Sequence, residues 1–193
     1  MISATNLTKR FGAKRIFDRL ELRLARGEFL LVTGPNGSGK TTLLRVLAGL
    51  DAPSRGELSL PARATIGYLG HEPLVYRELT PLENLRMFAS LYAIGGREQR
   101  IRMLLERFGL WEERDHRVST FSRGMRQRLG LCRVVLHDPQ LLVLDEPINA
   151  LDAAGATLLD ETLAAFSTTS AIVVATHDPA RIDALATARL SFG

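Results

Sequence analysis

The spacing of hydrophobic residues changes along the chain, and each spacing predicts a different element. Continuous apolar runs at 28–34, 140–147 and 170–178 are typical of strands buried on both faces of a sheet. A segment that is compatible with a helix follows each run. Alternation of strand and helix predicts an α/β fold with a parallel sheet.

Two other patterns lie on either side of the first run. The helix predicted after it carries four leucines on one face: Leu43, Leu44, Leu47 and Leu50. Nearer the N-terminus, apolar residues alternate with polar ones: Phe17, Leu20, Leu22 and Leu24. A period of two predicts an antiparallel strand with one face in water.

The middle of the chain has helical spacing throughout. Thr80, Pro81 and Glu83 fit the N-cap, first and third positions of a capping box, and 95–96 is a pair of glycines that ends the helix. The expected apolar face is Leu82, Leu85, Phe88 and Leu91 or Tyr92. A second helix carries Ile101, Leu104, Leu105 and Phe108. A third helix, which Ser122 is placed to cap, carries Met125, Leu129, Cys132 and Leu136.

These helices predict a helical insertion in an α/β core. We expect residues 1–71 to form an antiparallel β subdomain and the first part of the core. Residues 72–137 then form the helical subdomain, and residues 138–193 the second part of the core. The length of 193 residues fits one domain with such an insertion.

Composition narrows the class of protein only a little. The chain is 46% hydrophobic and 24% charged, which is ordinary for a globular protein. Cys132 is the single cysteine, so an internal disulfide is excluded, and this fits a reducing compartment. No signal peptide is visible, and no apolar stretch of about 18 residues predicts a membrane span.

The net charge of +4 is unevenly distributed. Residues 1–137 are basic, whereas residues 138–193 carry two arginines and eight acids. This asymmetry is typical of a nucleic-acid binder, or of a protein that holds a polyphosphate with its first part and a metal with its second.

The candidate chemistry begins with the stretch GPNGSGKT, which lies between a predicted strand and a predicted helix. Its glycines turn backbone N–H groups toward phosphate oxygens, and the helix N-terminus adds a positive dipole end. Lys40 is placed to reach the β- and γ-phosphates, and the Thr41 hydroxyl to bind Mg²⁺. The candidate phosphate-binding residues are Gly34, Pro35, Asn36, Gly37, Ser38, Gly39, Lys40, Thr41 and Thr42.

Acidic residues and a histidine follow the other two predicted strands. Because parallel strands meet the phosphate loop at their carboxyl ends, Asp145 is expected beside the Mg²⁺. Glu146 is placed to polarise an attacking water, and His177 to touch the γ-phosphate. Cys132 lies on an apolar helix face and is interpreted as a core residue.

These motifs, in this order, resemble the ATP-binding subunit of ABC transporters over essentially the whole chain. The resemblance implies a P-loop NTPase (RecA-like) α/β core with an N-terminal antiparallel β subdomain and an inserted helical subdomain. It implies catalysis by Glu146 with Lys40, a D-loop at 149–152, and a switch histidine at His177. It also places Phe11 where an aromatic ring stacks on adenine.

The stretch FSRGM at 121–125 is similar to the family signature L-S-G-G-Q. In the family, two subunits pair head to tail, and the signature of one closes over the ATP of the other. Ser122 and Gly124 would then cap the partner's γ-phosphate. Arg123 and Met125 replace a glycine and the glutamine, and we expect Arg123 to contact the opposite subunit.

A second departure from the family pattern is His71, which stands where relatives usually have a glutamine that senses Mg²⁺. A neutral imidazole accepts a hydrogen bond from metal-bound water or binds the metal, which would make this link sensitive to pH. The G-H-E and L-T-x-x-E-N-L pattern resembles the haem-export branch that serves cytochrome c maturation.

The resemblance implies Mg²⁺ and ATP as ligands, a head-to-tail homodimer, and membrane permease subunits bound by the helical subdomain. It implies a cytoplasmic position, peripheral on the inner face of the cell membrane, and no nucleic acid. Alternatives are the ATPase of a different exporter, a soluble ABC ATPase that acts on nucleic acid, and a nucleotide-binding module that no longer hydrolyses ATP.

Overall fold

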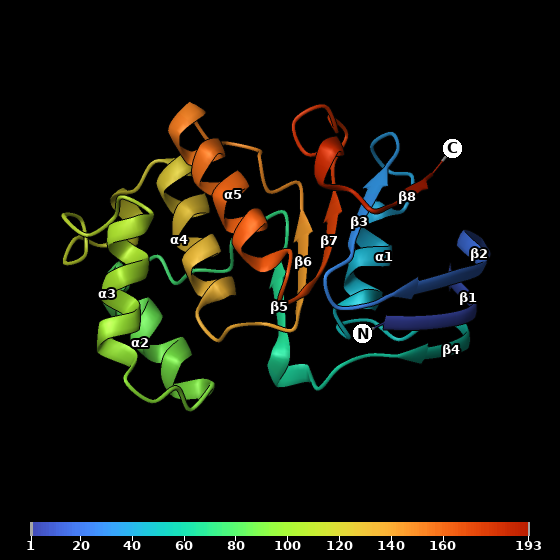
Figure 1. Ribbon diagram of the computed structural model, residues 1–193, viewed down its shortest axis with the longest axis horizontal. Helices are drawn as coiled ribbons and strands as arrows, with labels where there is room; N and C mark the ends of the chain where they lie inside the picture. Colours follow the sequence, from blue (N-terminus) through green and yellow to red (C-terminus); the bar gives the residue numbers. More distant parts are fainter. Residues whose placement is uncertain (1, 193) are drawn as a thin grey trace.

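The computed structural model describes residues 2–192, and a five-stranded parallel sheet runs through its centre (Figure 1). The strand order is β5-β6-β7-β3-β8, and every neighbouring pair is parallel. The strands are β3 (Phe29–Thr33), β5 (Ile66–Leu69), β6 (Leu141–Asp145), β7 (Ala171–Ala175) and β8 (Ala188–Ser191). The three strands predicted from continuous apolar runs are therefore confirmed, and the α/β class with them.

Burial of both sheet faces explains why these runs are continuous. In β6, Leu141 and Val143 face one hydrophobic cluster, while Leu142 and Leu144 face the other. All four side chains are at most 1% exposed. A strand in this position has no face on which a polar residue could reach water, so the usual alternation disappears.

An antiparallel sheet with the order β2-β1-β4 lies on one side of the molecule. Its strands are β1 (Ile2–Phe11), β2 (Lys14–Leu24) and β4 (Arg55–Ser59). In β2, Phe17 and Leu24 are buried and Leu20 is partly buried, which confirms the predicted one-sided strand. A register shift at Arg19, whose φ is 50°, lets residues three apart share a face.

Helix α1 (Lys40–Leu47) packs between the two sheets, with Leu43, Leu44 and Leu47 fully buried. The prediction that Leu50 shares this face is wrong. The helix ends at Leu47, Gly49 turns the chain with φ of 67°, and Leu50 is 40% exposed.

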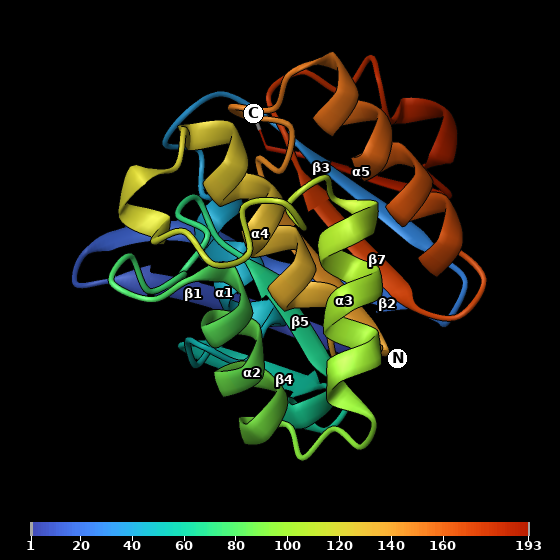
Figure 2. The same ribbon diagram turned by 90° about the vertical axis from the view of Figure 1, so that its left-hand side faces the viewer.

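Four helices lie on the other side of the parallel sheet: the last two in the sequence pack on the sheet, and the first two lie outside the third (Figure 1 and Figure 2). They are α2 (Pro81–Leu91), α3 (Arg97–Arg107), α4 (Arg123–Val135) and α5 (Ala153–Phe166). The predicted capping box is present. Thr80 Oγ1 accepts a hydrogen bond from the Glu83 backbone amide at 3.2 Å, and Glu83 Oε2 accepts one from the Thr80 backbone amide at 2.9 Å. Leu91 is 73% exposed, so Tyr92 takes the last place on the buried face and stacks on His137.

Helix α4 is fastened to the segment that follows β5. Arg133 is 8% exposed and donates to the carbonyl oxygens of Tyr68 at 2.7 Å and Pro73 at 3.3 Å. Gly130 packs so close to Pro73 that a Cβ at this glycine would lie 2.5 Å from the proline Cβ. Cys132 is fully buried on the same helix, which confirms its assignment to the core.

The segment after β7 corrects a further prediction. Instead of a full helix it forms a short 3₁₀ turn at Asp183–Leu185, where the amides of Ile182 and Asp183 both donate to the Pro179 carbonyl. The chain then enters β8, an edge strand whose exposed alternate residues weaken its hydrophobic pattern. Similar 3₁₀ turns lie at Arg63–Thr65 and Val118–Thr120.

The division of the chain into subdomains at 71/72 and 137/138 stays a prediction. Helices α2, α3 and α4 lie between β5 and β6 in the sequence.

Candidate functional site

A pocket of about 510 Å³ lies at the carboxyl ends of β3, β6 and β7. Eleven of the predicted residues line it: Phe11, Asn36, Gly37, Gly39, Lys40, Thr41, Thr42, His71, Asp145, Glu146 and His177. Gly34, Pro35 and Ser38 belong to the loop behind this lining, whereas Ser122 and Gly124 lie at the start of α4. The fold thus brings residues from five separate parts of the sequence together at one end of the sheet.

The loop 34–40 has a shape that only glycine permits at Gly39. This residue is the N-cap of α1 and has φ of 114°, in the range that L side chains rarely adopt. A Cβ built there would lie 2.5 Å from Ile16 Cγ2. Absence of a side chain lets the backbone run close to β2 and directs the first N–H groups of α1 toward the pocket.

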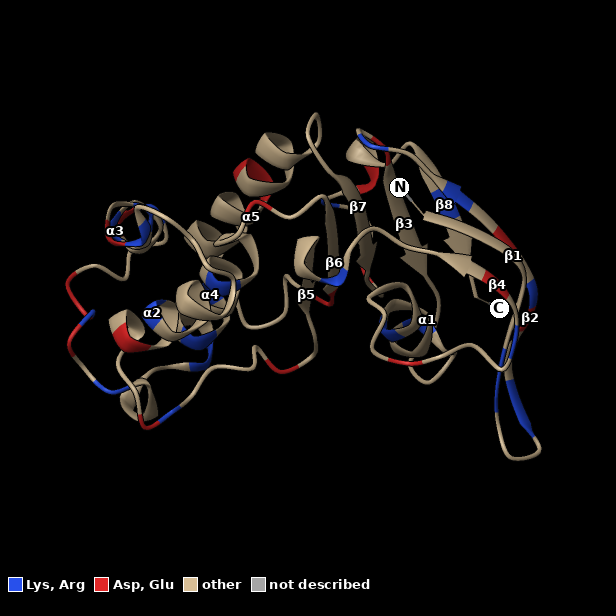
Figure 3. Ribbon diagram, turned by 90° about the horizontal axis from the view of Figure 1, so that it is seen from below, with Lys and Arg blue, Asp and Glu red and all other residues tan. Residues whose placement is uncertain are grey.

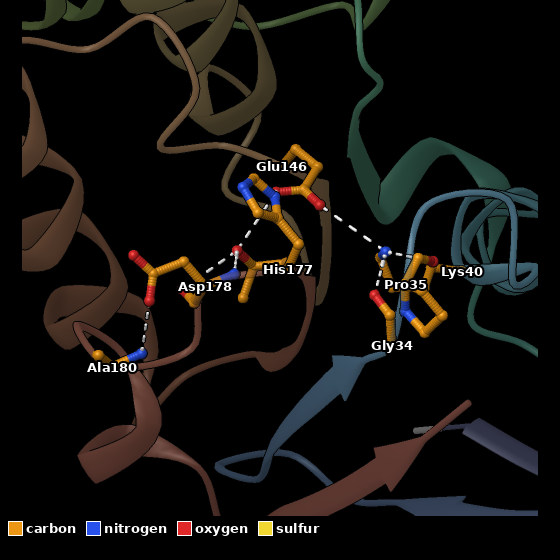
Figure 4. Close-up of polar contacts among 8 residues, drawn as sticks. Gly34, Pro35, Lys40, Glu146, His177, Asp178 and Ala180 are labelled. Atoms are coloured by element: carbon orange, nitrogen blue, oxygen red, sulfur yellow. Dashed lines mark hydrogen bonds and ion pairs between the residues drawn. The ribbon is translucent and has the colours of Figure 1, made fainter. Parts of the chain in front are cut away.

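Lys40 is folded back over the loop that precedes it (Figure 4). Its Nζ donates to the carbonyl oxygens of Gly34 at 2.7 Å and Pro35 at 3.2 Å, and the residue is 6% exposed. Glu146 Oε1 lies 3.9 Å away. The ammonium is therefore held at the pocket floor by groups that an anionic ligand can replace.

Asp145 is 2% exposed, and its Oδ2 has no hydrogen-bond partner among residues 2–192. Burial raises the pKa of Asp145 above its usual range, and interaction with the Thr41 hydroxyl opposes this rise. A buried acceptor beside a hydroxyl fits Mg²⁺, which binds one or two protein oxygens together with substrate phosphates. No cluster of three or more His, Cys, Asp or Glu side chains that could hold a metal occurs within the described chain.

Glu146 follows Asp145 with φ of 50°, an unusual conformation for a residue other than glycine. Its Oε2 lies 2.9 Å from His177 Nδ1 and accepts from Thr176 Oγ1 at 3.2 Å (Figure 4). Its backbone amide donates to the Ala175 carbonyl at 2.9 Å. The carboxylate is 12% exposed, and these contacts hold it from the end of β7.

Phe11 stands at the end of β1, at the mouth of the pocket. It is 54% exposed, so it is available to a planar ligand rather than packed in the core. Lys9 Nζ lies 4.9 Å from the ring centroid, and Figure 3 shows that the hairpin between β1 and β2 is basic. Sequence reasoning missed Lys14 and Ile16, which line the same mouth from β2.

Ser122 and Gly124 do not meet the pocket residues within one chain. Ser122 Oγ caps α4 by accepting from the Met125 amide at 3.1 Å, as its position in the sequence predicts. A Cβ at Gly124 would lie 2.8 Å from the Ala150 carbonyl oxygen. Glycine is thus required by the neighbouring loop of the same chain, and the role of both residues across a dimer interface stays a prediction.

Gln127 makes a buried hydrogen bond near the site that the sequence analysis missed. Its Nε2 donates to the Pro147 carbonyl at 3.1 Å, and the residue is 5% exposed. Pro147 directly follows Glu146, so Gln127 ties α4 to the loop that carries the candidate base. Its only signal in the sequence is a polar residue among the buried positions of an amphipathic helix.

Replacing Gln127 by methionine is expected to lower kcat for ATP hydrolysis by about tenfold, with little change in KM. Methionine fills similar space but leaves the buried Pro147 carbonyl without a donor, so the loop at Glu146 loses one of its supports. Steady-state kinetics of ATP hydrolysis gives kcat and KM of the variant. The same change at Gln99, exposed on α3, is the matched control, and an unchanged kcat for the Gln127 variant would contradict this positioning role.

Comparison with known proteins agrees with this geometry. Residues 17–149 match the family described as ABC transporter. The chain is 42% identical over 162 residues to the cytochrome c biogenesis ATP-binding export protein CcmA of Methylococcus capsulatus, covering 79% of this chain and 78% of that protein.

It is also 40% identical over 166 residues to the daunorubicin resistance ATP-binding protein DrrA3 of Streptomyces coeruleorubidus, covering 80% of this chain. The chain spans about half the length of several curated relatives that it matches, with 52% of the Streptomyces protein covered.

Two solved structures share the whole fold. An ATP-binding subunit of an ABC transporter superposes with a TM-score of 0.91 at 26% identity, covering 100% of this chain and 85% of that one. A dimeric post-hydrolysis state of an ATP-binding cassette bound to ADP and Pi superposes with a TM-score of 0.85, also at 26% identity. It covers 100% of this chain and 94% of the other.

Proposed function

The chain belongs to the ABC transporter family as one of its ATP-binding domains, and from this premise we propose that it hydrolyses ATP to power an exporter. The observation that carries the proposal is the single pocket shared by Lys40, Asp145, Glu146 and His177. A phosphate loop, a buried carboxylate and a supported glutamate are parts that phosphoryl transfer to water requires.

Binding of ATP uses the loop and the hairpin. The adenine ring stacks on exposed Phe11, and the phosphates lie against the backbone N–H groups at the start of α1. The Lys40 ammonium exchanges its carbonyl partners for phosphate oxygens, which carry more negative charge and form stronger hydrogen bonds. Thr41 and Asp145 are the protein residues that would hold Mg²⁺, which neutralises charge on the phosphates when bound.

Hydrolysis joins the oxygen of a water to the γ-phosphorus and breaks the bond from that phosphorus to the bridging oxygen, giving ADP, inorganic phosphate and a proton. Glu146 orients the water and takes its proton. Its contacts with Thr176 and His177 fix the carboxylate, and the ammonium of Lys40 lies 3.9 Å from it. The imidazole of His177 is half exposed, which leaves it free to meet the γ-phosphate edge.

The proposed assembly is a head-to-tail homodimer in which Ser122 and Gly124 cap the ATP of the partner. Support comes from the dimeric structural relative and from the α4 N-terminus, whose dipole favours an anion. None of the helices described between residues 2 and 192 is long and apolar enough to cross a bilayer. We propose permease subunits as separate chains, bound by the helical subdomain, which would hold this subunit on the cytoplasmic face of the membrane.

For the cargo we propose haem export in cytochrome c biogenesis. The identity to a cytochrome c biogenesis export protein and the His71 motif support this proposal. Relatives named for daunorubicin resistance and lantibiotic transport are of comparable similarity, so export of a different compound is the second candidate.

The test is capture of the chain with its native membrane partners, combined with an ATPase assay. We expect Mg²⁺-dependent hydrolysis and a polytopic partner that binds haem. A permease for another compound would overturn the haem proposal while leaving the ATPase intact. Absence of hydrolysis together with DNA binding that falls steeply with salt would favour the nucleic-acid alternative.

A further inference from the structure

A second pocket, of about 470 Å³, lies beside the first, between residues 71–77 and the start of α4. His71 and Asn149 line both pockets, so the two cavities meet at these side chains. The second pocket is therefore a neighbouring compartment of the proposed catalytic site, although none of the phosphate-loop residues lines it.

Basic side chains dominate this compartment. Arg77, Arg123 and Arg126 line it, and Glu72 is the only acidic residue in its lining. Figure 3 shows the basic residues of α4 on this part of the molecule. The guanidinium groups of Arg77 and Arg123 form no hydrogen bond or ion pair with any residue in the range 2–192, while Arg126 donates to the Phe121 carbonyl.

Because Arg77 and Arg123 have no acidic partner within residues 2–192, the positive charge of this cavity favours an anion. Arginine forms paired hydrogen bonds with phosphate oxygens, and Arg123 and Arg126 lie on the same side of the first turn of α4. We propose that this pocket binds inorganic phosphate, and that it receives the phosphate that hydrolysis releases in the adjoining site. This inference rests on the proposed ATPase function.

His71 and Asn149, which line both pockets, define the route of the phosphate. Phosphate leaves the γ-position between His71 and Asn149, whose side chains offer hydrogen bonds on both sides of the opening. The positive potential of the arginine compartment lowers the free energy of the dianion there, away from the carboxylates of Asp145 and Glu146. Arg123 lines this pocket, and its expected contact with an opposite subunit stays a prediction.

The experiment titrates inorganic phosphate into the full chain saturated with Mg²⁺ and ADP, so that the ADP phosphates occupy the loop. Isothermal calorimetry gives the Kd of phosphate for the parent chain and for Arg77→Gln and Arg123→Gln. Each variant is expected to weaken phosphate binding by about tenfold, the value of one charge-assisted contact. Arg107→Gln, an exposed arginine at the end of α3, is the matched control and should bind phosphate like the parent.

Unchanged ADP affinity in each variant shows that it is folded, and ATP hydrolysis is measured on the same samples. Hydrolysis without any phosphate binding, or equal loss in the Arg107 control, would overturn this inference and leave the ATPase proposal standing. A pocket that prefers glutamate to phosphate would also overturn it, because that result indicates a carboxylate from a partner. Phosphate binding that depends on these arginines in a chain that hydrolyses no ATP would sink the proposed function instead, together with the origin of the phosphate.

Discussion

Replacing Lys40 by alanine is expected to weaken ATP binding by on the order of 10²- to 10⁴-fold, since two charge-assisted hydrogen bonds are lost at about 1.5–3 kcal/mol each. The side chain is buried at the pocket floor, and its Nζ is held by carbonyl oxygens that phosphates can replace. A water molecule in place of the ammonium would supply hydrogen bonds but no positive charge to the phosphates. Equilibrium titration with a fluorescent ATP analogue measures the effect.

Arg45→Ala is the control for this change, because it removes one cation from the same helix at a residue that does not line the pocket. The arginine pairs with Asp51 at the surface, where an ion pair contributes little to stability. The control should bind ATP like the parent. Unchanged affinity in the Lys40 variant would show that the loop 34–41 does not hold the phosphates.

Replacing Glu146 by glutamine is expected to lower kcat by on the order of 10²- to 10⁴-fold while ATP still binds. Glutamine keeps the shape of the side chain and a carbonyl oxygen that can accept from Thr176, but it cannot take a proton from water. ATP-bound dimers should therefore accumulate. Size-exclusion chromatography with ATP, together with release of phosphate over time, measures both effects.

Glu161→Gln makes the same chemical change on the exposed side of α5 and serves as the control. It should hydrolyse ATP at the parent rate and show no accumulation of dimer. If the Glu146 variant also retains the parent rate, the catalytic base lies elsewhere in the pocket. Loss of ATP binding in that variant would instead indicate that the carboxylate mainly positions Lys40 for the phosphates.

The elements predicted correctly are those whose signal is local in the sequence. The capping box at Thr80 and Glu83 and the loop that ends at Lys40 each depend on residues within a few positions of one another. Strand β6 is predictable because burial on both faces makes its first four residues apolar, and Asp145 stands only at its end. In each case the neighbouring residues alone determine the conformation.

Contacts between distant segments were not predictable in this way. Glu146 meets Thr176 and His177 across 30 and 31 positions, and of these only the histidine has a side chain whose chemistry draws attention. Gln127 lies 20 positions from Pro147. The choice between Leu91 and Tyr92 also needs the structure, because both fit the helical period and only Tyr92 meets a distant residue, His137.

The attachment of α4 to the segment after β5 has a consequence for motion. Arg133 and the close contact of Gly130 with Pro73 leave no room for the helix and this segment to slide past each other. Helix α4 and the segment that contains His71 therefore move as one rigid unit. Ser122 lies at the N-terminal end of this helix, and β5, which leads to His71, is bound near its C-terminal end. Their amide hydrogens should exchange with deuterium as one cooperative unit, so a displacement at either end is transmitted to the other.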